Sequence, residues 1–168
     1  METIQTMQQE LTRYFLAEKY ESCIFVLVGI LAIAVSIWLL VQQHTFKSMS
    51  YPLIAVGLIQ IIVGGSVYLR SDTQIVTLAA QVQSAPQAYK ADEIKRMDVV
   101  NKNFKTYKVI EIALLALGIG LIYAFPRHDT WYFLGVGLII QSSFMLVFDL
   151  FAEHRAYAYL DCINKYIS

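Results

Sequence analysis

The chain has 168 residues, which is room for one domain. Hydrophobic residues make up 57% of it and charged residues only 15%, whereas a soluble domain carries about a quarter charged residues. Its thirteen basic and thirteen acidic residues cancel, so no net field points to nucleic acid as a partner. Because the apolar residues lie in four long blocks, not in short periodic runs, we expect an all-α integral membrane protein whose first partner is the lipid bilayer.

The N-terminal segment 1–20 is polar and mixed in charge. A secretory signal would start with a basic stretch and reach its apolar core sooner, so we expect the first apolar block to be retained as a helix. Within the segment, Ile4, Met7, Leu11 and Tyr14 recur at spacings of three and four. This spacing predicts a helix with one apolar face.

The four apolar blocks predict membrane-spanning helices at about 22–42, 51–69, 107–125 and 130–151. Each is close to the roughly 20 residues that a helix needs to cross about 30 Å of hydrocarbon. Backbone groups in lipid must be paired internally, so each block should be helical despite its Val and Ile content. Four consecutive spans predict an up-down antiparallel bundle.

The positions of the basic residues predict the orientation. Four spans place both tails and the central segment 70–106 on one side, and all basic residues except Lys47 and Arg127 lie on that side. Because Lys and Arg collect on the cytoplasmic side of a membrane, we expect the N-terminus, the C-terminus and the central segment to be cytoplasmic. The membrane is expected to be a bacterial-type inner (plasma) membrane.

The spans are expected to continue as helices outside the membrane. Ile75, Leu78 and Val82 form a stripe before Pro86, and the C-terminal tail has neither Gly nor Pro after Asp149. We expect the segments 1–20, 70–106 and 152–168 to pack as one cytoplasmic helical bundle. The alternative is amphipathic helices that lie flat on the membrane surface.

Small residues predict where helices approach closely, since packing drives helix association in lipid. Folding the chain about its two short loops gives three expected glycine pairs: Gly118 with Gly137, Gly120 with Gly135, and Gly29 with Gly64. Deeper in the spans, Ser36, Gln60 and Gln141 are expected to make interhelical hydrogen bonds.

Charged residues at the ends of the spans predict a polar belt at the cytoplasmic membrane boundary. The expected members are Glu21, Arg70, Lys105, Lys108, Glu111, Asp149 and Glu153. Ionisable groups within a span are costly and often functional. We expect Lys105 and Lys108 to hold Glu111 and Asp149, and we keep a proton or cation relay as the alternative.

The same alignment places Glu153 near Lys102, and Glu21 near Arg70 and Asp72. No metal site or cofactor is expected: Glu153 and His154 are adjacent, so they point about 100° apart on a helix. The two cysteines, Cys23 and Cys162, are read as small apolar residues on the reducing side.

In the central segment the basic residues alternate with Asp92, Glu93 and Asp98. This alternation is interpreted as a solvated face of mixed charge.

The favoured function is a non-enzymatic binding or accessory protein that recruits a protein partner through its cytoplasmic helices, with a second copy of the chain as another candidate partner. By analogy of architecture, the narrowest form of this hypothesis is an immunity protein against a membrane-acting toxin. One alternative is a channel or proton/cation-coupled transport subunit that uses Glu111 and Asp149. The other is a membrane enzyme on a lipid-soluble substrate, with Arg70 and Glu111 around a cytoplasmic-side cleft.

Overall fold

The computed structural model describes residues 2–42 and 45–167, and within these ranges the chain is all-helical. Four long helices follow one another, with a short 3₁₀ helix before the second: α1 (Glu2–Gln42), η1 (Lys47–Met49), α2 (Ser50–Ser84), α3 (Pro86–Ala124) and α4 (Asp129–Tyr166). Each long helix is long and apolar enough to cross a membrane. The expectation of an all-helical chain with four such helices is confirmed.

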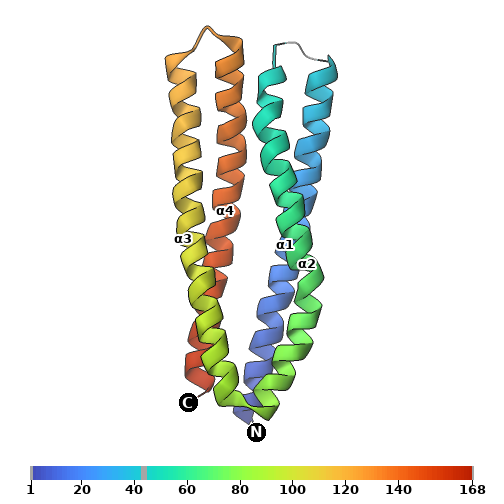
Figure 1. Ribbon diagram of the computed structural model, residues 1–168, viewed down its shortest axis with the longest axis vertical. Helices are drawn as coiled ribbons and strands as arrows, with labels where there is room; N and C mark the ends of the chain where they lie inside the picture. Colours follow the sequence, from blue (N-terminus) through green and yellow to red (C-terminus); the bar gives the residue numbers. More distant parts are fainter. Residues whose placement is uncertain (1, 43–44, 168) are drawn as a thin grey trace.

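The four long helices run alternately up and down (Figure 1). The shortest of them has 35 residues, or about 52 Å at 1.5 Å per residue, against about 30 Å of hydrocarbon. Each helix therefore extends well beyond its apolar stretch. Both chain ends and the α2–α3 corner lie at one end of the molecule, here called the terminal end (residues 2–20, 70–106 and 152–167). The two short connections lie at the other end, the turn end.

The corner between α2 and α3 is made by Ala85 and Pro86. Ala85 has φ −149° and ψ 69°, away from the helical region, because a following proline disfavours helical geometry in the residue before it. Pro86 then opens α3, where its fixed φ suits a first helical position and its missing N–H costs no hydrogen bond. Ala85 is thus the one residue between the two helices.

The terminal end is closed by one apolar core to which all four helices contribute. The side chains predicted from helical spacing face one another there, together with residues that the spacing did not single out. Its buried members are Met7, Leu11, Tyr14, Phe15, Val82, Tyr89, Met97, Ala156, Tyr159, Ile163 and Ile167. Burying one large apolar side chain contributes about 1.5–3 kcal/mol, so this core stabilises the terminal end strongly.

Along the apolar part, α1 packs closely with α2, and glycines set the approach. A Cβ built on Gly29 would lie 2.7 Å from the carbonyl oxygen of Gly57, and one on Gly57 would lie 3.0 Å from the oxygen of Gly29. The expected pairing of Gly29 with Gly64 is therefore wrong. Gly64 instead faces α1 nearer the terminal end, where a Cβ built on Gly64 would lie 2.9 Å from the carbonyl oxygen of Ser22.

The register differs because the chain reverses earlier than the midpoint near Phe46 on which the pairing was based. The hydroxyl of Ser50 donates to the carbonyl oxygen of Ser36 at 3.2 Å, so the first residue of α2 already lies alongside α1. The preceding η1 (Lys47–Met49) belongs to the descending arm as well.

Between α3 and α4 the close pair is Gly118 with Gly135. A Cβ on Gly118 would lie 2.8 Å from the oxygen of Gly135, and the reverse distance is 2.6 Å. The expected pairs of Gly118 with Gly137 and of Gly120 with Gly135 are wrong. A Cβ built on Gly120 has nothing within 4 Å of it. Gly137 faces the start of α2, where a Cβ built on it would lie 2.6 Å from Pro52 Cγ.

The glycines that face each other between α3 and α4 differ from the expected pairs for a simple reason. The expected pairs assume a turn centred between Arg127 and His128. In the structure α3 ends at Ala124 and α4 begins at Asp129, so the centre lies one residue earlier. Moving the centre of an antiparallel turn by one residue moves every facing pair by two.

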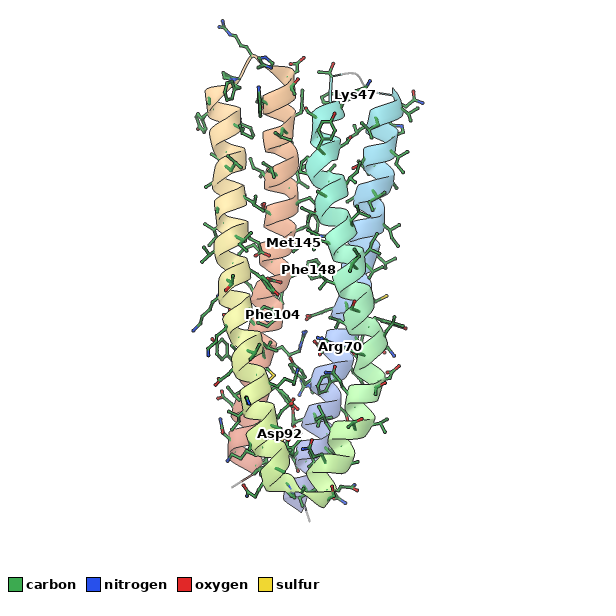
Figure 2. The ribbon with its side chains drawn as sticks, viewed as in Figure 1. Lys47, Arg70, Asp92, Phe104, Met145 and Phe148 are labelled. Atoms are coloured by element: carbon green, nitrogen blue, oxygen red, sulfur yellow. The ribbon has the colours of Figure 1, made fainter. Side chains whose placement is uncertain are left out.

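Polar side chains join the two hairpins in the middle of the apolar part. Gln60 is fully buried, and its amide donates to the side-chain oxygen of Gln141 at 3.4 Å. The amide of Gln141 donates in turn to the carbonyl oxygen of Leu53 at 3.5 Å. The interhelical bonding expected of the two glutamines is confirmed. Nearby, Met145 and Phe148 of α4 point toward the α1–α2 hairpin (Figure 2).

Candidate functional site

Charged pairs connect the helices where the terminal end meets the apolar part. Two of them attach α4 to its neighbours: Lys108 Nζ lies 2.6 Å from Glu153 Oε2, and Arg155 pairs with Glu21. Two further pairs join α1 and α2: Lys19 with Asp72 at 2.7 Å and Arg70 with Glu18 at 3.4 Å. Several of these partners differ from those expected from the sequence.

Glu153 was expected near Lys102 and instead binds Lys108. By the register of the close glycine pair, the residue facing Lys108 on α4 is Met145, so Glu153 lies about two helical turns further along. Side chains on a helix lean toward the N-terminus of that helix. On antiparallel α3 and α4 they lean toward each other along the axis, which brings such distant positions together.

The partner of Glu21 also differs. Glu21 was expected near Arg70 and Asp72, but it pairs with Arg155 of α4. Arg70 reaches Glu18, one turn earlier on α1. Glu21 therefore connects the two hairpins, whereas Arg70 acts within the first hairpin. Arg70 and Glu111, which the enzyme hypothesis placed around one cleft, belong to separate contacts.

Glu111 and Asp149 face each other between α3 and α4. Glu111 is 4% exposed, and neither of its carboxyl oxygens accepts a hydrogen bond from a donor in the described residues. The carboxyl group of Asp149 lies within hydrogen-bonding reach of it. The expected role of the two lysines is not seen, because Lys105 is exposed and the ammonium of Lys108 binds Glu153.

A second polar cluster lies inside the core of the terminal end, where the sequence predicted a solvated face. Glu93 is only 2% exposed. Its carboxylate accepts hydrogen bonds from the guanidinium of Arg96 at 2.8 and 2.7 Å and from the hydroxyl of Tyr159 at 3.0 Å. The hydroxyls of Tyr159 and Tyr89 are 2.6 Å apart. The interpretation of Glu93 as a solvated charge is wrong.

Spacing in the sequence does carry a signal for this cluster. Tyr89, Glu93, Met97 and Asn101 are each four residues apart and all are buried on α3. Residues four apart share one face of a helix. Two of these four positions are polar, so the face does not stand out as an apolar stripe. The signal that could have found it is the pairing of Glu93 with Arg96 three residues later, which neutralises the buried charge.

Ring contacts extend the cluster to α1. Tyr14 stacks on Tyr159 with ring centroids 4.2 Å apart and an angle of 12° between the planes. Two guanidinium groups lie over the rings of α1, Arg96 at 5.3 Å from the centroid of Phe15 and Arg155 at 5.6 Å from that of Tyr14. Cation–π contacts contribute about 0.5–2 kcal/mol each, more when desolvated. The cluster therefore holds α1, α3 and α4 in one register.

Burial also determines the charge states in this cluster. It raises the pKa of Tyr14 to about 12, and it raises the pKa of Tyr159 further, with the neighbouring Glu93 carboxylate adding to the effect. Burial alone would lower the pKa of Arg96, but the hydrogen bond to Glu93 outweighs it and the pKa rises. Tyr14 and Tyr159 thus stay neutral, and Tyr159 donates a hydrogen bond to the charged Glu93–Arg96 pair.

The outer surface of the terminal end differs between helices. On α3 the exposed charged residues are of mixed sign: Lys95, Asp98, Lys102 and Lys105. On α1 one open face carries mainly amide, hydroxyl and aromatic groups and one cation. Among its residues are Gln5, Gln9, Thr12, Arg13, Leu16 and Tyr20.

The cluster and the open face of α1 differ in what they can do chemically. The polar groups of the cluster largely satisfy one another and only Arg96 is partly exposed, so they specify the packing of helices. Within the described residues no group of three or more His, Cys, Asp or Glu could hold a metal ion, and Cys23 and Cys162 are free thiols. The open face of α1 can meet another molecule.

Comparisons with protein-family models, with curated proteins and with solved structures found no match for this chain. Two features of the structure remain as grounds for a function. One is the open face of α1 at the terminal end, and the other is the buried carboxyl pair between α3 and α4.

Proposed function

We propose that the chain is a non-enzymatic binding or accessory protein of a bacterial-type inner membrane, with its terminal end in the cytoplasm. The orientation is supported by the basic residues, since only Lys47 and Arg127 of the thirteen lie in the two short connections. The packed core of the terminal end makes it a rigid helical platform at the membrane surface. A rigid helix face is suited to binding a protein partner, because little conformational freedom is lost on binding.

The composition of the open face of α1 is the observation that carries this proposal. This face contains Arg13, Tyr20 and Leu16 with glutamines and a threonine, and no acidic residue or lysine. Protein–protein interfaces are enriched in Tyr and Arg and depleted in Lys, Glu and Asp. The α3 face, with three exposed lysines and one aspartate, does not have this composition. We therefore assign the partner surface to α1.

A photoreactive amino acid at position 9 tests the assignment in living cells. Gln9 is exposed on the open face of α1, and Val99 is 55% exposed on α3 and serves as the matched control. A probe at Gln9 should give one discrete adduct, and Arg13→Ala should weaken it without unfolding the protein because Arg13 lies outside the core. An adduct of twice the mass of the chain would identify a second copy as the partner. Equal labelling from both positions, or none from Gln9, would contradict the proposal.

An immunity protein against a membrane-acting toxin is the narrowest form of this proposal, and it is supported by analogy of architecture alone. The test is whether the chain protects cells from such a toxin. Cells that produce the chain should survive a membrane-acting toxin encoded beside its gene, and Arg13→Ala should reduce survival. Full protection by a chain with Arg13→Ala and Tyr20→Ala would place the protective surface elsewhere.

A channel or proton/cation-coupled transport subunit is the second candidate, because polar groups continue into the apolar part. The carboxyl pair Glu111–Asp149 is followed toward the middle of the helices by the bonded amides of Gln60 and Gln141. Buried ionisable groups within a span often mark ion or proton pathways. Proton and potassium flux into liposomes should then be abolished by Asp149→Asn in a normally folded protein. No flux in the wild type would leave the accessory function as the better proposal.

A further inference from the structure

The carboxyl group of Glu111 has no donor for either oxygen within the described residues, although the residue is 4% exposed. Asp149 Oδ2 is also buried without a donor. A buried polar group that lacks a hydrogen bond costs about 1–3 kcal/mol, and an unpaired buried charge costs more. The arrangement is therefore stable only if something between the two carboxyl groups satisfies them.

The chemistry of carboxyl groups limits what can satisfy Glu111 and Asp149. An ionised carboxylate only accepts hydrogen bonds, so two carboxylates in contact repel each other. When one of them carries a proton, it becomes a donor and the contact becomes a hydrogen bond. The direct approach of Asp149 to Glu111 thus fits a pair that holds one proton.

The charged side chains nearest to Glu111 and Asp149 are paired with other residues and do not satisfy the two carboxyl groups. On α3 the ammonium of Lys108 is bound to Glu153 of α4 at 2.6 Å, which leaves no net charge from that pair. On α1 the charged residue closest to the apolar stretch is Glu21, which pairs with Arg155. On α2 the corresponding residue is Arg70, which pairs with Glu18.

We propose that Glu111 and Asp149 form a binding site for one proton, which the two carboxyl groups share and which comes from water at the terminal end. The Lys108–Glu153 pair lies between the site and the terminal end, about one helical turn away along both helices, and it is partly exposed. It provides the polar route by which the proton exchanges. The bound proton holds α3 and α4 together at this level, and this role does not depend on the proposed partner surface.

Infrared spectroscopy of the protein in lipid nanodiscs at neutral pH tests the site directly. A shared proton should give the carbonyl stretch of a protonated carboxylic acid, shifted when H₂O is replaced by D₂O. Glu111→Gln should remove this band, whereas Glu153→Gln should leave it, because Glu153 is an ionised partner of Lys108. If Glu111→Gln fails to fold, Asp149→Asn serves instead, since its amide donates to Glu111 as the proton does.

Two results would overturn the proposal. One is the absence of a protonated-acid band in the folded wild type at neutral pH. The other is a melting temperature that rises with added sodium but not with lower pH, because the pair would then hold a metal cation. With a bound proton, the melting temperature of the wild type should fall as rising pH removes the proton, and the fall should be smaller in Asp149→Asn.

Discussion

Replacing Gly135 by alanine should force α3 and α4 apart. The added Cβ would lie 2.6 Å from the carbonyl oxygen of Gly118, and 3.1 Å from both Leu121 Cβ and Ile122 Cγ1. Ordinary contact begins near 3.4 Å, so relief needs a separation of about 0.8 Å. A backbone oxygen cannot rotate away, and the whole helix must move. Overpacking of this kind costs about 1–3 kcal/mol.

The same helix pair offers a matched control in Gly120→Ala. A Cβ at Gly120 meets nothing within 4 Å, so no packing is lost. Alanine is also favoured over glycine in a helix by about 1 kcal/mol. The two substitutions make the same chemical change on facing helices, and they should alter stability in opposite directions.

Thermal unfolding in mild detergent, followed by circular dichroism, measures both variants. At roughly 2–4 °C per kcal/mol for a chain of this size, Gly135→Ala should lower the melting temperature by about 2–12 °C. Gly120→Ala should leave it unchanged or raise it slightly. Equal melting temperatures for the two variants would refute the close approach at Gly135, since only packing against α3 distinguishes the two positions.

Three further predictions concern the terminal end and the orientation. Glu93→Ala should cost about 3–5 kcal/mol because it removes a buried carboxylate and leaves the half-buried Arg96 guanidinium and the Tyr159 hydroxyl without their acceptor, whereas Asp72→Ala, at a pair that is 67% exposed on the acid side, should cost about 1 kcal/mol or less in the same unfolding assay. Burial raises the pKa of Tyr159 above its ordinary value of 10.0, so the stability it contributes is fully present below about pH 10 and is lost as pH rises further; Tyr159→Phe should flatten the alkaline loss seen by circular dichroism. A reporter that is active only outside the cytoplasm should be active in the loop at 43–50 and silent at 83–87, and activity at 83–87 would reverse the proposed orientation.

The helical content and the approximate spans could be predicted from the sequence because they depend on composition over long stretches. About 20 apolar residues suffice to indicate a spanning helix, and errors of a few residues at its ends do not matter. The stripe of Ile4, Met7 and Leu11 likewise indicated a buried face, and its members pack against the core of the terminal end.

Helix register could not be predicted in the same way, since it depends on the exact residue at which the chain turns. A shift of one residue in the α3–α4 turn replaced Gly137 by Gly135 as the partner of Gly118. The direction of side chains added a second error: the partner of Lys108 lies about two turns from the position that faces it. Neither effect changes the periodicity from which the helices were inferred.

Charge patterning alone did not predict the burial of Glu93, because it says nothing of which face a charge occupies. A carboxylate is normally exposed, and its burial requires donors for its oxygens. Those donors include Tyr159, which is 66 residues away in the sequence and meets Glu93 only through the arrangement of the helices. The cluster is a property of tertiary structure.

The core of the terminal end also fixes an order of assembly during synthesis. Met7 and Leu11 come from the first turns of α1, whereas Ile163 and Ile167 come from the end of α4. The first pair leaves the ribosome long before the second, and domains made in this way expose apolar surface until their last element arrives. Until then, the apolar face of α1 that carries Met7 and Leu11 lacks the cover that the end of the chain provides in the finished fold.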